Sequence, residues 1–255
     1  MMTTVVAAID NSGAAAPVVA TANRIAELYG ATARAIHVRE DGVATARAAA
    51  EHAGLELEIV EGRPIDALGE AARDPDVQAV VLGSRGTSGG PRPAGSTAIE
   101  FVGSVATPVI LVPPDIENPG RIESILVPLD GTPASAAALA GTINLARRSG
   151  VEVVVLHVHE EERLPPFSEH LQHEARAWAE EFVARNCPCP LEEVKLELRV
   201  GVPHEHLVQV VSDTGVDLVA IGWSQELVPG RAAVVREALS RCPVPVLLIP
   251  VNPGA

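Results

Sequence analysis

The chain of 255 residues contains two copies of one pattern, and this repeat constrains the fold more than any other feature of the sequence. In each copy a short apolar run ends in an aspartate, VVAAID in the first copy and ILVPLD in the second. Four matched pairs lie 120 residues apart: Asp10 and Asp130, Gly30 and Gly150, His37 and His157, and Val38 and Val158. Because such a register is hard to obtain by chance, the sequence predicts two tandem units of the same fold.

The two copies differ in length at two places. Further along the chain the offset becomes 139, which pairs Gly62 with Gly201 and Gly83 with Gly222, so the second copy carries 19 additional residues within 160–190. Near the end of each copy TPVILVP matches VPVLLIP at an offset of 137, so the second copy is two residues shorter where the first has a glycine-rich loop. Between the copies, PPDIENPGR has the Pro/Gly/Asn composition of a short linker. We therefore expect two domains, 1–117 and 118–255, with the boundary near Asn118.

Each copy alternates short apolar runs with amphipathic stretches, the pattern of a parallel sheet covered by helices on both faces. In the first copy the predicted strands are 4–9, 33–38, 56–61, 77–82 and 109–112. The expected fold class is α/β, with two tandem doubly wound, mainly parallel five-stranded sheets. We expect the two units to pack as an intramolecular pseudo-dimer through their last strands, 109–112 and 246–249, and whole chains to pair in addition. Ser12 is the expected cap of a helix through Tyr29, with Gly30 at its carboxyl end.

Composition excludes several classes of function. The formal net charge is −14 and the sequence has a single lysine, Lys195, so it lacks the basic face that nucleic acids and anionic membranes require. The amino-terminal apolar run stops at Asp10, too early for a signal peptide or a membrane span. Three cysteines form no even disulfide framework. These features predict a cytosolic protein with reduced thiols.

The stretch GSRGTSGGPRPAGST, residues 83–97, follows a predicted strand and has the composition of a loop that binds a phosphate. Gly83 and Gly86 are expected to adopt positive φ and bring backbone N–H groups close to an anion. Gly95, Ser96 and Thr97 open the next predicted helix, which adds free N–H groups, a positive dipole end and two hydroxyls. Arg85 and Arg92 are candidates for the countercharge. Asp10, Val38 and Gly83 should stand on the same rim, at the carboxyl ends of neighbouring strands.

Taken together, these motifs resemble the universal stress protein family over nearly the whole chain. They are the aspartate after the first strand, the His-Val ending the second, GSRG, GST and the closing TPVILVP. The resemblance implies an adenine nucleotide α-hydrolase-like fold. It also implies an ATP or AMP site, with or without Mg²⁺, in which Asp10 and Val38 meet adenine and ribose, Gly83 packs under the sugar, and the remaining motif residues, Gly86, Gly95, Ser96 and Thr97, hold the phosphates. ATP-binding members carry G-x₂-G-x₉-G-(S/T), whereas here eight residues separate Gly86 from Gly95.

The second copy lacks the features that face a phosphate. Gln225 stands where the second glycine belongs, and Ala232-Ala233 replace the Gly-Ser that should open the last helix. Asp130 and Val158 remain, so the second copy is expected either to serve in packing alone or to bind a different, apolar ligand. The inserted segment 160–190 carries Trp178 and Phe182 on one helical face, which suits either internal packing or a partner surface.

Plainer structural roles stand beside these functional ones. Asp10 is equally suited to closing the turn into the next helix, and the hydroxyls of Ser96 and Thr97 are equally suited to capping. His37 and His157 are expected to be satisfied, half-buried histidines rather than catalytic groups, and the sequence offers no catalytic or metal-ligand motif.

The sequence therefore favours a cytosolic nucleotide-responsive regulatory or stress-tolerance module that hydrolyses ATP slowly at most. It acts on a partner that the sequence does not identify. Two alternatives stay open: a nucleotide-free scaffold of two degenerate domains, and an enzyme of phosphoryl or adenylyl transfer.

Overall fold

The computed structural model describes residues 3–39, 42–85, 94–116, 119–159, 171–225 and 232–251, and for 171–175 only the backbone. The strands are β1 (Thr4–Ile9), β2 (Thr32–Val38), β3 (Leu57–Val60), β4 (Val77–Gly83), β5 (Val109–Val112), β6 (Ser124–Pro128), β7 (Glu152–His159), β8 (Lys195–Val200), β9 (Leu218–Trp223) and β10 (Val246–Pro250). The helices are α1 (Ala15–Tyr29), α2 (Ala44–His52), α3 (Pro64–Ala72), α4 (Ser96–Ser104), α5 (Pro133–Arg148), α6 (Leu171–Asn186), the 3₁₀ turn η2 (Leu191–Glu193), α7 (Pro203–Thr214) and α8 (Ala233–Arg241).

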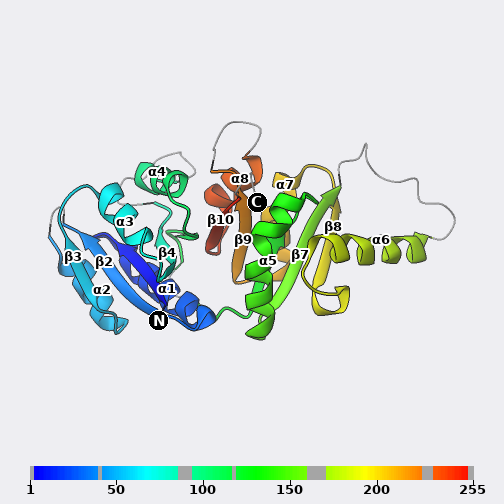
Figure 1. Ribbon diagram of the computed structural model, residues 1–255. Coiled ribbons are helices and arrows are strands. Elements are labelled where there is room, and N and C mark those ends of the chain that lie inside the picture. Colours follow the sequence, from blue (N-terminus) through cyan, green and yellow to red (C-terminus); the bar gives the residue numbers. More distant parts are fainter. Residues whose placement is uncertain are drawn as a thin grey trace.

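All ten strands form one continuous sheet in the order β3-β2-β1-β4-β5-β10-β9-β6-β7-β8 (Figure 1). Within each half of the chain neighbouring strands are parallel, and the two halves repeat the same order about the centre. The halves join where β10 pairs with β5 in the antiparallel sense, with Val246 opposite Leu111 and Leu248 opposite Val109. The predicted pairing of the last strands is therefore confirmed, and it merges the two expected sheets into one.

The strands lie close to where the apolar runs predict them. Predicted strands 4–9 and 109–112 coincide with β1 and β5, and the other three in the first half differ by one residue at one or both ends. Parallel strands that are buried on both faces consist of nearly continuous Val, Ile and Leu, which makes their bounds easy to find in a sequence.

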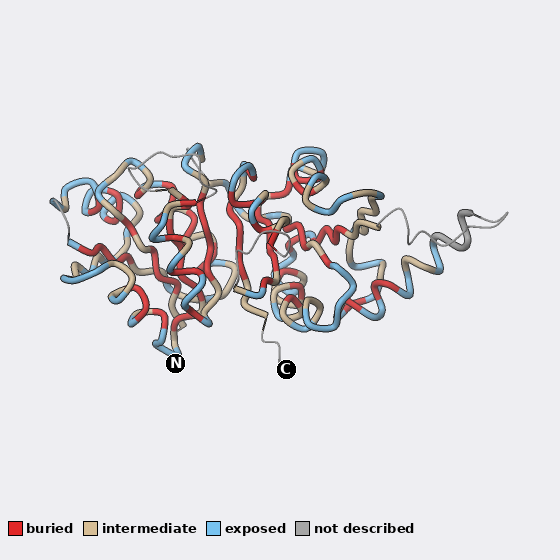
Figure 2. The backbone as a smooth tube through the Cα atoms, turned by 90° about the horizontal axis from the view of Figure 1, so that it is seen from above, coloured by how far each residue is buried: buried red, intermediate tan, exposed pale blue. Residues whose placement is uncertain are grey.

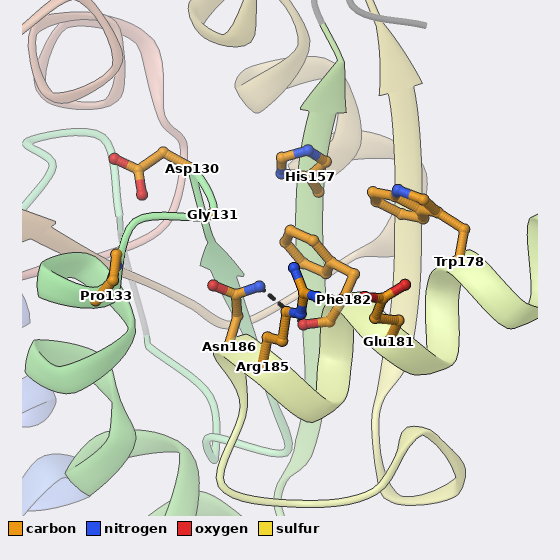
Figure 3. Close-up of a pocket in the computed structure, with 9 residues that line it drawn as sticks. All are labelled: Asp130, Gly131, Pro133, His157, Trp178, Glu181, Phe182, Arg185 and Asn186. Atoms are coloured by element: carbon orange, nitrogen blue, oxygen red, sulfur yellow. Dashed lines mark hydrogen bonds and ion pairs between the residues drawn. The ribbon is translucent and has the colours of Figure 1, made fainter. Parts of the chain in front are cut away.

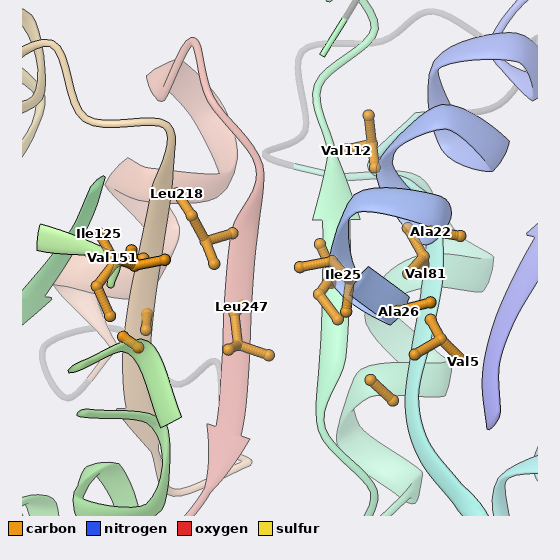
Figure 4. Packing of buried hydrophobic residues seen from close by; sticks show 14 of the residues in the cluster. Val5, Ala22, Ile25, Ala26, Val81, Val112, Ile125, Val151, Leu218 and Leu247 are labelled. Atoms are coloured by element: carbon orange, nitrogen blue, oxygen red, sulfur yellow. The ribbon is translucent and has the colours of Figure 1, made fainter. Parts of the chain in front are cut away.

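Helices cover both faces of the sheet, and each face has its own hydrophobic core. One core contains residues of α1, α2, α5 and α6, and the other contains residues of α3, α4, α7 and α8. In the first core the contacts come from small aliphatic side chains such as Val5, Ile25 and Leu247 (Figure 4). Figure 2 shows the buried backbone mainly inside the molecule and exposed segments mainly at its periphery, and the edge strands β3 and β8 contain no buried residue. Among the described helices, none has the length and apolar composition needed to cross a membrane.

The ends of α1 test the capping predictions. Gly30 takes a left-handed conformation, φ 63°, and closes the helix as predicted. Ser12 is not the cap, because α1 begins at Ala15 with Ala14 in the capping position and no side-chain capping bond. The Ser12 hydroxyl instead accepts a hydrogen bond from the Ala14 N–H, two residues later in the chain, at 3.2 Å. The residues between β1 and α1 thus form a polar turn rather than a simple cap.

Candidate functional site

The carboxyl ends of β2, β1 and β4 form one rim in the first half. Ile9 lies opposite His37, and Ala8 lies opposite Leu82, so Asp10, Val38 and Gly83 end three adjacent strands at one edge of the sheet. In an open parallel sheet this edge is where ligands bind. The structure therefore brings these three predicted residues to one side of the sheet.

Asp10 closes the turn that follows β1. Its Oδ1 accepts hydrogen bonds from the Ser12 N–H at 3.0 Å and from the Ser12 hydroxyl. Within the described part of the chain, Oδ2 has no hydrogen-bond partner. One carboxylate oxygen is thus structural, and the other is available to a ligand.

His37 holds the end of β2 in place. The ring is 2% exposed, and its two nitrogens lie 2.9 Å from the Ile9 carbonyl oxygen and 3.1 Å from the Gly42 carbonyl oxygen. The histidine is a satisfied core residue, as its position at the end of a strand predicts. Its neighbour Val38 is 8% exposed and presents an aliphatic surface at the rim.

Gly83 is needed for space rather than for an unusual backbone conformation. It does not have a positive φ, which corrects the prediction made from the glycine pattern. A Cβ at this position would lie 3.3 Å from the Arg85 carbonyl oxygen and 3.7 Å from the Ala14 Cβ. The missing side chain therefore lets the chain turn back closely over the start of α1. Gly86, the other glycine of this pair, lies outside the described residues, as do residues 87–93.

The start of α4 carries two unused hydroxyls. The Gly95 N–H donates to the Ser84 carbonyl oxygen at 2.8 Å, which fixes the first turn of α4 beside the end of β4. Gly95 is the capping residue, and no side chain makes a capping bond, so Ser96 and Thr97 are not caps. Both are exposed, and their hydroxyls form no hydrogen bond within the described residues. Together with the free N–H groups of a first helical turn, these hydroxyls can donate to an anion.

Arg85 lies close to residues of the second half of the chain. It lines a cavity of about 220 Å³ between the two halves, together with Asp115 and Arg241. The structure thus places the predicted countercharge at the junction of the halves, while Arg92 lies outside the described residues.

The second half repeats the rim but not the anion site. The Oδ1 of Asp130 accepts from the Thr132 N–H at 2.9 Å and the Thr132 hydroxyl at 2.8 Å, the counterpart of the turn at Asp10. The Nδ1 of His157 lies 2.7 Å from the Leu129 carbonyl oxygen, the counterpart of the contact between His37 and Ile9. At the last helix, α8 begins after Ala232 with no hydroxyl and no capping bond.

Gln225 occupies the position of the second glycine and keeps a glycine-like conformation, φ 62°. Its side-chain Nε2 donates to the Val105 carbonyl oxygen at 2.6 Å, at the carboxyl end of α4 in the first half. The residue at the position of the second glycine is therefore tied to the first half. Sequence reasoning recognised the lost glycine but not this contact, because nothing in the local pattern names a partner 120 residues away.

A larger cavity, about 640 Å³, lies at the rim of the second half (Figure 3). The turn after β6, with Asp130, Gly131 and Pro133, forms one side, and α6 of the inserted segment forms the other. The aromatic rings are those of His157, Trp178 and Phe182, with Trp178 stacked on Phe182 at 5.1 Å between ring centroids. Among the described residues, no group of three or more His, Cys, Asp or Glu side chains is placed to hold a metal ion.

Comparisons with solved structures place this fold among known ones. A functionally unknown protein from Pseudomonas aeruginosa PAO1 matches with a TM-score of 0.71 and 12% identity, covering 98% of this chain and 93% of the other. A universal stress protein from Archaeoglobus fulgidus DSM 4304 matches with a TM-score of 0.70 and 16% identity, covering 98% of each chain. No curated protein shows significant sequence similarity to this chain.

Shorter structures match half of the chain. A universal stress protein solved in complex with cAMP covers 51% of this chain and 98% of its own, with 18% identity and a TM-score of 0.36, so it says nothing about the ligand of this chain. The family model described as "Universal stress protein family" matches residues 39–113 and 121–250, one region in each half. The chain therefore belongs to the universal stress protein family.

Proposed function

We propose that this protein binds ATP or AMP in its first half, residues 1–117, and works as a cytosolic nucleotide-responsive regulatory module. The second half, residues 118–255, lacks the phosphate site and supplies the packing partner that completes the sheet. The observation that carries this proposal is the pair of exposed, unbonded hydroxyls of Ser96 and Thr97 at the first turn of α4. That turn is held beside the end of β4, at the same edge of the sheet as Asp10, which follows the neighbouring strand β1.

The rim supplies groups for the rest of a nucleotide. Asp10 has one free carboxylate oxygen for a ribose hydroxyl or a base N–H, and Val38 offers an aliphatic surface. Gly83 leaves room where a side chain would meet the loop backbone. The phosphates would lie at the start of α4, where the helix dipole favours negative charge despite the acidic net charge of the chain.

Helix α4 gives nucleotide binding a route to the second half. Its first turn holds the proposed phosphate site, and the Val105 carbonyl at its other end accepts the hydrogen bond from Gln225. A nucleotide bound at the start of α4 would favour one position of α4 and of Gln225. A partner that reads this surface would then distinguish the nucleotide-bound form from the free form.

Calorimetric titration of nucleotide-stripped protein with ATP and with AMP, each with and without Mg²⁺, tests the proposal when it is combined with Ser96→Glu. A carboxylate at the first position of a helix is favourable for folding but occupies and repels the phosphate site. We expect Ser96→Glu to weaken ATP binding by about 100-fold, the effect of losing a charge-assisted anion site.

The matched control is Ala233→Glu, which places the same carboxylate at the first position of α8. It should leave ATP binding unchanged. If Ala233→Glu weakens binding as much as Ser96→Glu, or if Ser96→Glu binds like the unmodified chain, the site is not at the start of α4 and the proposal is wrong.

A scaffold without any nucleotide is the second candidate, and the tie between Gln225 and α4 favours it, because this contact joins the halves without a ligand. The same titration separates the two. A chain that binds neither ATP nor AMP is a scaffold.

A further inference from the structure

The cavity at the rim of the second half exists because of the inserted segment. Its outer wall is α6, which covers the carboxyl end of β7 and has 16 residues, whereas its counterpart in the first half, α2, has nine. Phe182 is 7% exposed and belongs to the core that α6 shares with α1, α2 and α5, so α6 is anchored at this point. At about 640 Å³ the cavity has the size of a site for a small organic molecule.

The cavity offers hydrogen-bond acceptors beside the ion pair of Arg185 and Glu181. Asn186 is 8% exposed, and its Nδ2 donates to the Phe182 carbonyl oxygen at 2.8 Å. The side-chain oxygen of Asn186 has no partner within the described residues and points toward Pro133 across the cavity (Figure 3). This oxygen is not one of the fully buried atoms without a partner, so it can accept from water or from a donor group of a ligand.

His157 adds a second acceptor. The Leu129 carbonyl oxygen can only accept, so in its neutral form the ring donates from Nδ1 and has a lone pair on Nε2. Asp130 adds a carboxylate that forms no ion pair within the described residues. Arg185 and Glu181 lie one turn apart on α6 and form an ion pair, so their charges cancel. The cavity therefore has an excess of negative charge and of acceptors.

The apolar part of the wall is aromatic. Phe182 and Trp178 stack with an interplanar angle of 19°, and His157 packs on Phe182 at 4.3 Å between ring centroids. Such a wall favours a flat ring, and it also favours a cation, because the faces of aromatic rings carry negative potential. An anion is disfavoured, since two carboxylates, Asp130 and Glu181, and only one guanidinium, that of Arg185, line the cavity.

We propose that the second half binds a cationic, nitrogen-bearing aromatic compound without a phosphate group, in the cavity between the turn at Asp130 and α6. Its ring lies against Phe182 and Trp178, and its N–H groups donate to the Asn186 side-chain oxygen and to Asp130. This site is separate from the proposed nucleotide site, and either can fail without the other.

Benzamidine and benzoate test the proposal, because they have nearly the same shape and opposite charges. The chain has two tryptophans, so a ¹⁵N–¹H spectrum contains two indole N–H resonances, and Trp178→Phe identifies which one belongs to Trp178. We expect benzamidine to shift the Trp178 resonance in a saturable manner and to leave that of the buried Trp223 unchanged. Benzoate should produce no saturable shift.

Asp130→Asn keeps the oxygen that accepts from Thr132 and removes the charge. It should weaken benzamidine binding by about fivefold, the effect of losing one solvent-exposed ion pair. Asp10→Asn, the same change in the first half, and Ser96→Glu should leave benzamidine binding unchanged.

Three results would overturn the proposal. They are the absence of a saturable benzamidine shift, equal binding of benzoate, and displacement of benzamidine from Trp178 by ATP. The last result would make the second half a nucleotide site.

Discussion

The two halves keep the same rim and differ at the place where a phosphate would lie. Asp10 and Asp130 close equivalent turns, and His37 and His157 make equivalent contacts to the preceding strand. By contrast, the first half has Ser96 at the start of its last helix where the second has Ala233. The comparison teaches that the turn at the aspartate belongs to the fold, whereas the hydroxyls and glycines of the loop are specific to the first half.

The largest effect should come from the core of the last helix, where the halves also differ. Phe101 is fully buried in α4, and the matching residue of α8 is Ala238. Phe101→Ala should lower the free energy of unfolding by about 3–5 kcal/mol, because it removes a large ring and leaves a cavity. Ala238→Gly should cost only about 1 kcal/mol, the propensity difference inside a helix. Urea denaturation measures both, and equal losses would show that the two helices pack alike.

A smaller effect on stability should distinguish the backbone strain at Gln225 from the hydrogen bond of its side chain. Gln225→Ala keeps a side chain in the left-handed region and loses the bond to the Val105 carbonyl, whereas Gln225→Gly loses the bond but relieves the strain. We expect the glycine variant to be more stable than the alanine variant by about 1 kcal/mol. Urea denaturation of the pair decides this. If both variants match the unmodified chain, Gln225 does not tie the halves together.

The docking of α6 should depend on acid pH. Burial and the neighbouring His157 lower the pKa of His159, whose ring lies 4.4 Å from that of Trp178 between centroids. A lowered pKa in the folded state means that the unfolded chain takes up the proton first as the pH falls below its ordinary value of 6.5. This contribution to stability is therefore present above pH 6.5 and is lost progressively below it. The midpoint temperature of thermal unfolding, monitored by tryptophan fluorescence, should decrease as the pH is lowered below 6.5. In His159→Gln this decrease should be smaller.

The smallest effect concerns two thiols at alkaline pH, that of the partly buried Cys187 and that of the buried Cys242. Burial raises the pKa of Cys187 to about 12, with a smaller contribution from Cys189, and raises that of Cys242 to about 11. The unfolded chain ionises its thiols first, so stability is complete below pH 9 and declines between pH 9 and these values. Alkylation at pH 8 should be slow in the folded chain and rapid after urea is added. Rapid alkylation of the folded chain would contradict the burial of these residues.

The sequence predicts most of the fold because continuous apolar runs mark the buried parallel strands. The repeat adds support, because each element predicted in one half has a counterpart in the other. The bounds of β1 and β5 and the cap at Gly30 follow from such local patterns, and the junction of β5 with β10 follows from the repeat. The misses come from contacts that the residue type alone does not reveal. Ser12 gives way to Ala14 because its hydroxyl is engaged in the turn with Asp10, and Gly83 is required by contacts with Arg85 and Ala14 rather than by its own φ.

The candidate sites divide in the same way. The rim residues of the first half could be named from the ends of strands, since parallel strands bring their carboxyl ends together. The cavity at α6 could not, because Asn186 and Phe182 face Asp130 only after the inserted helix has packed. The single hint was the spacing of Trp178 and Phe182 on one face of a helix, which suits ordinary core packing equally well.

The most direct test of the difference between the halves is the number of nucleotide sites on one chain, counted by calorimetric titration of nucleotide-stripped protein with ATP. We predict one site per chain, lost in Ser96→Glu and retained in Ala233→Glu. Two sites per chain would contradict the account, because the second half would then bind a nucleotide without the hydroxyls and glycines on which the first half is proposed to depend.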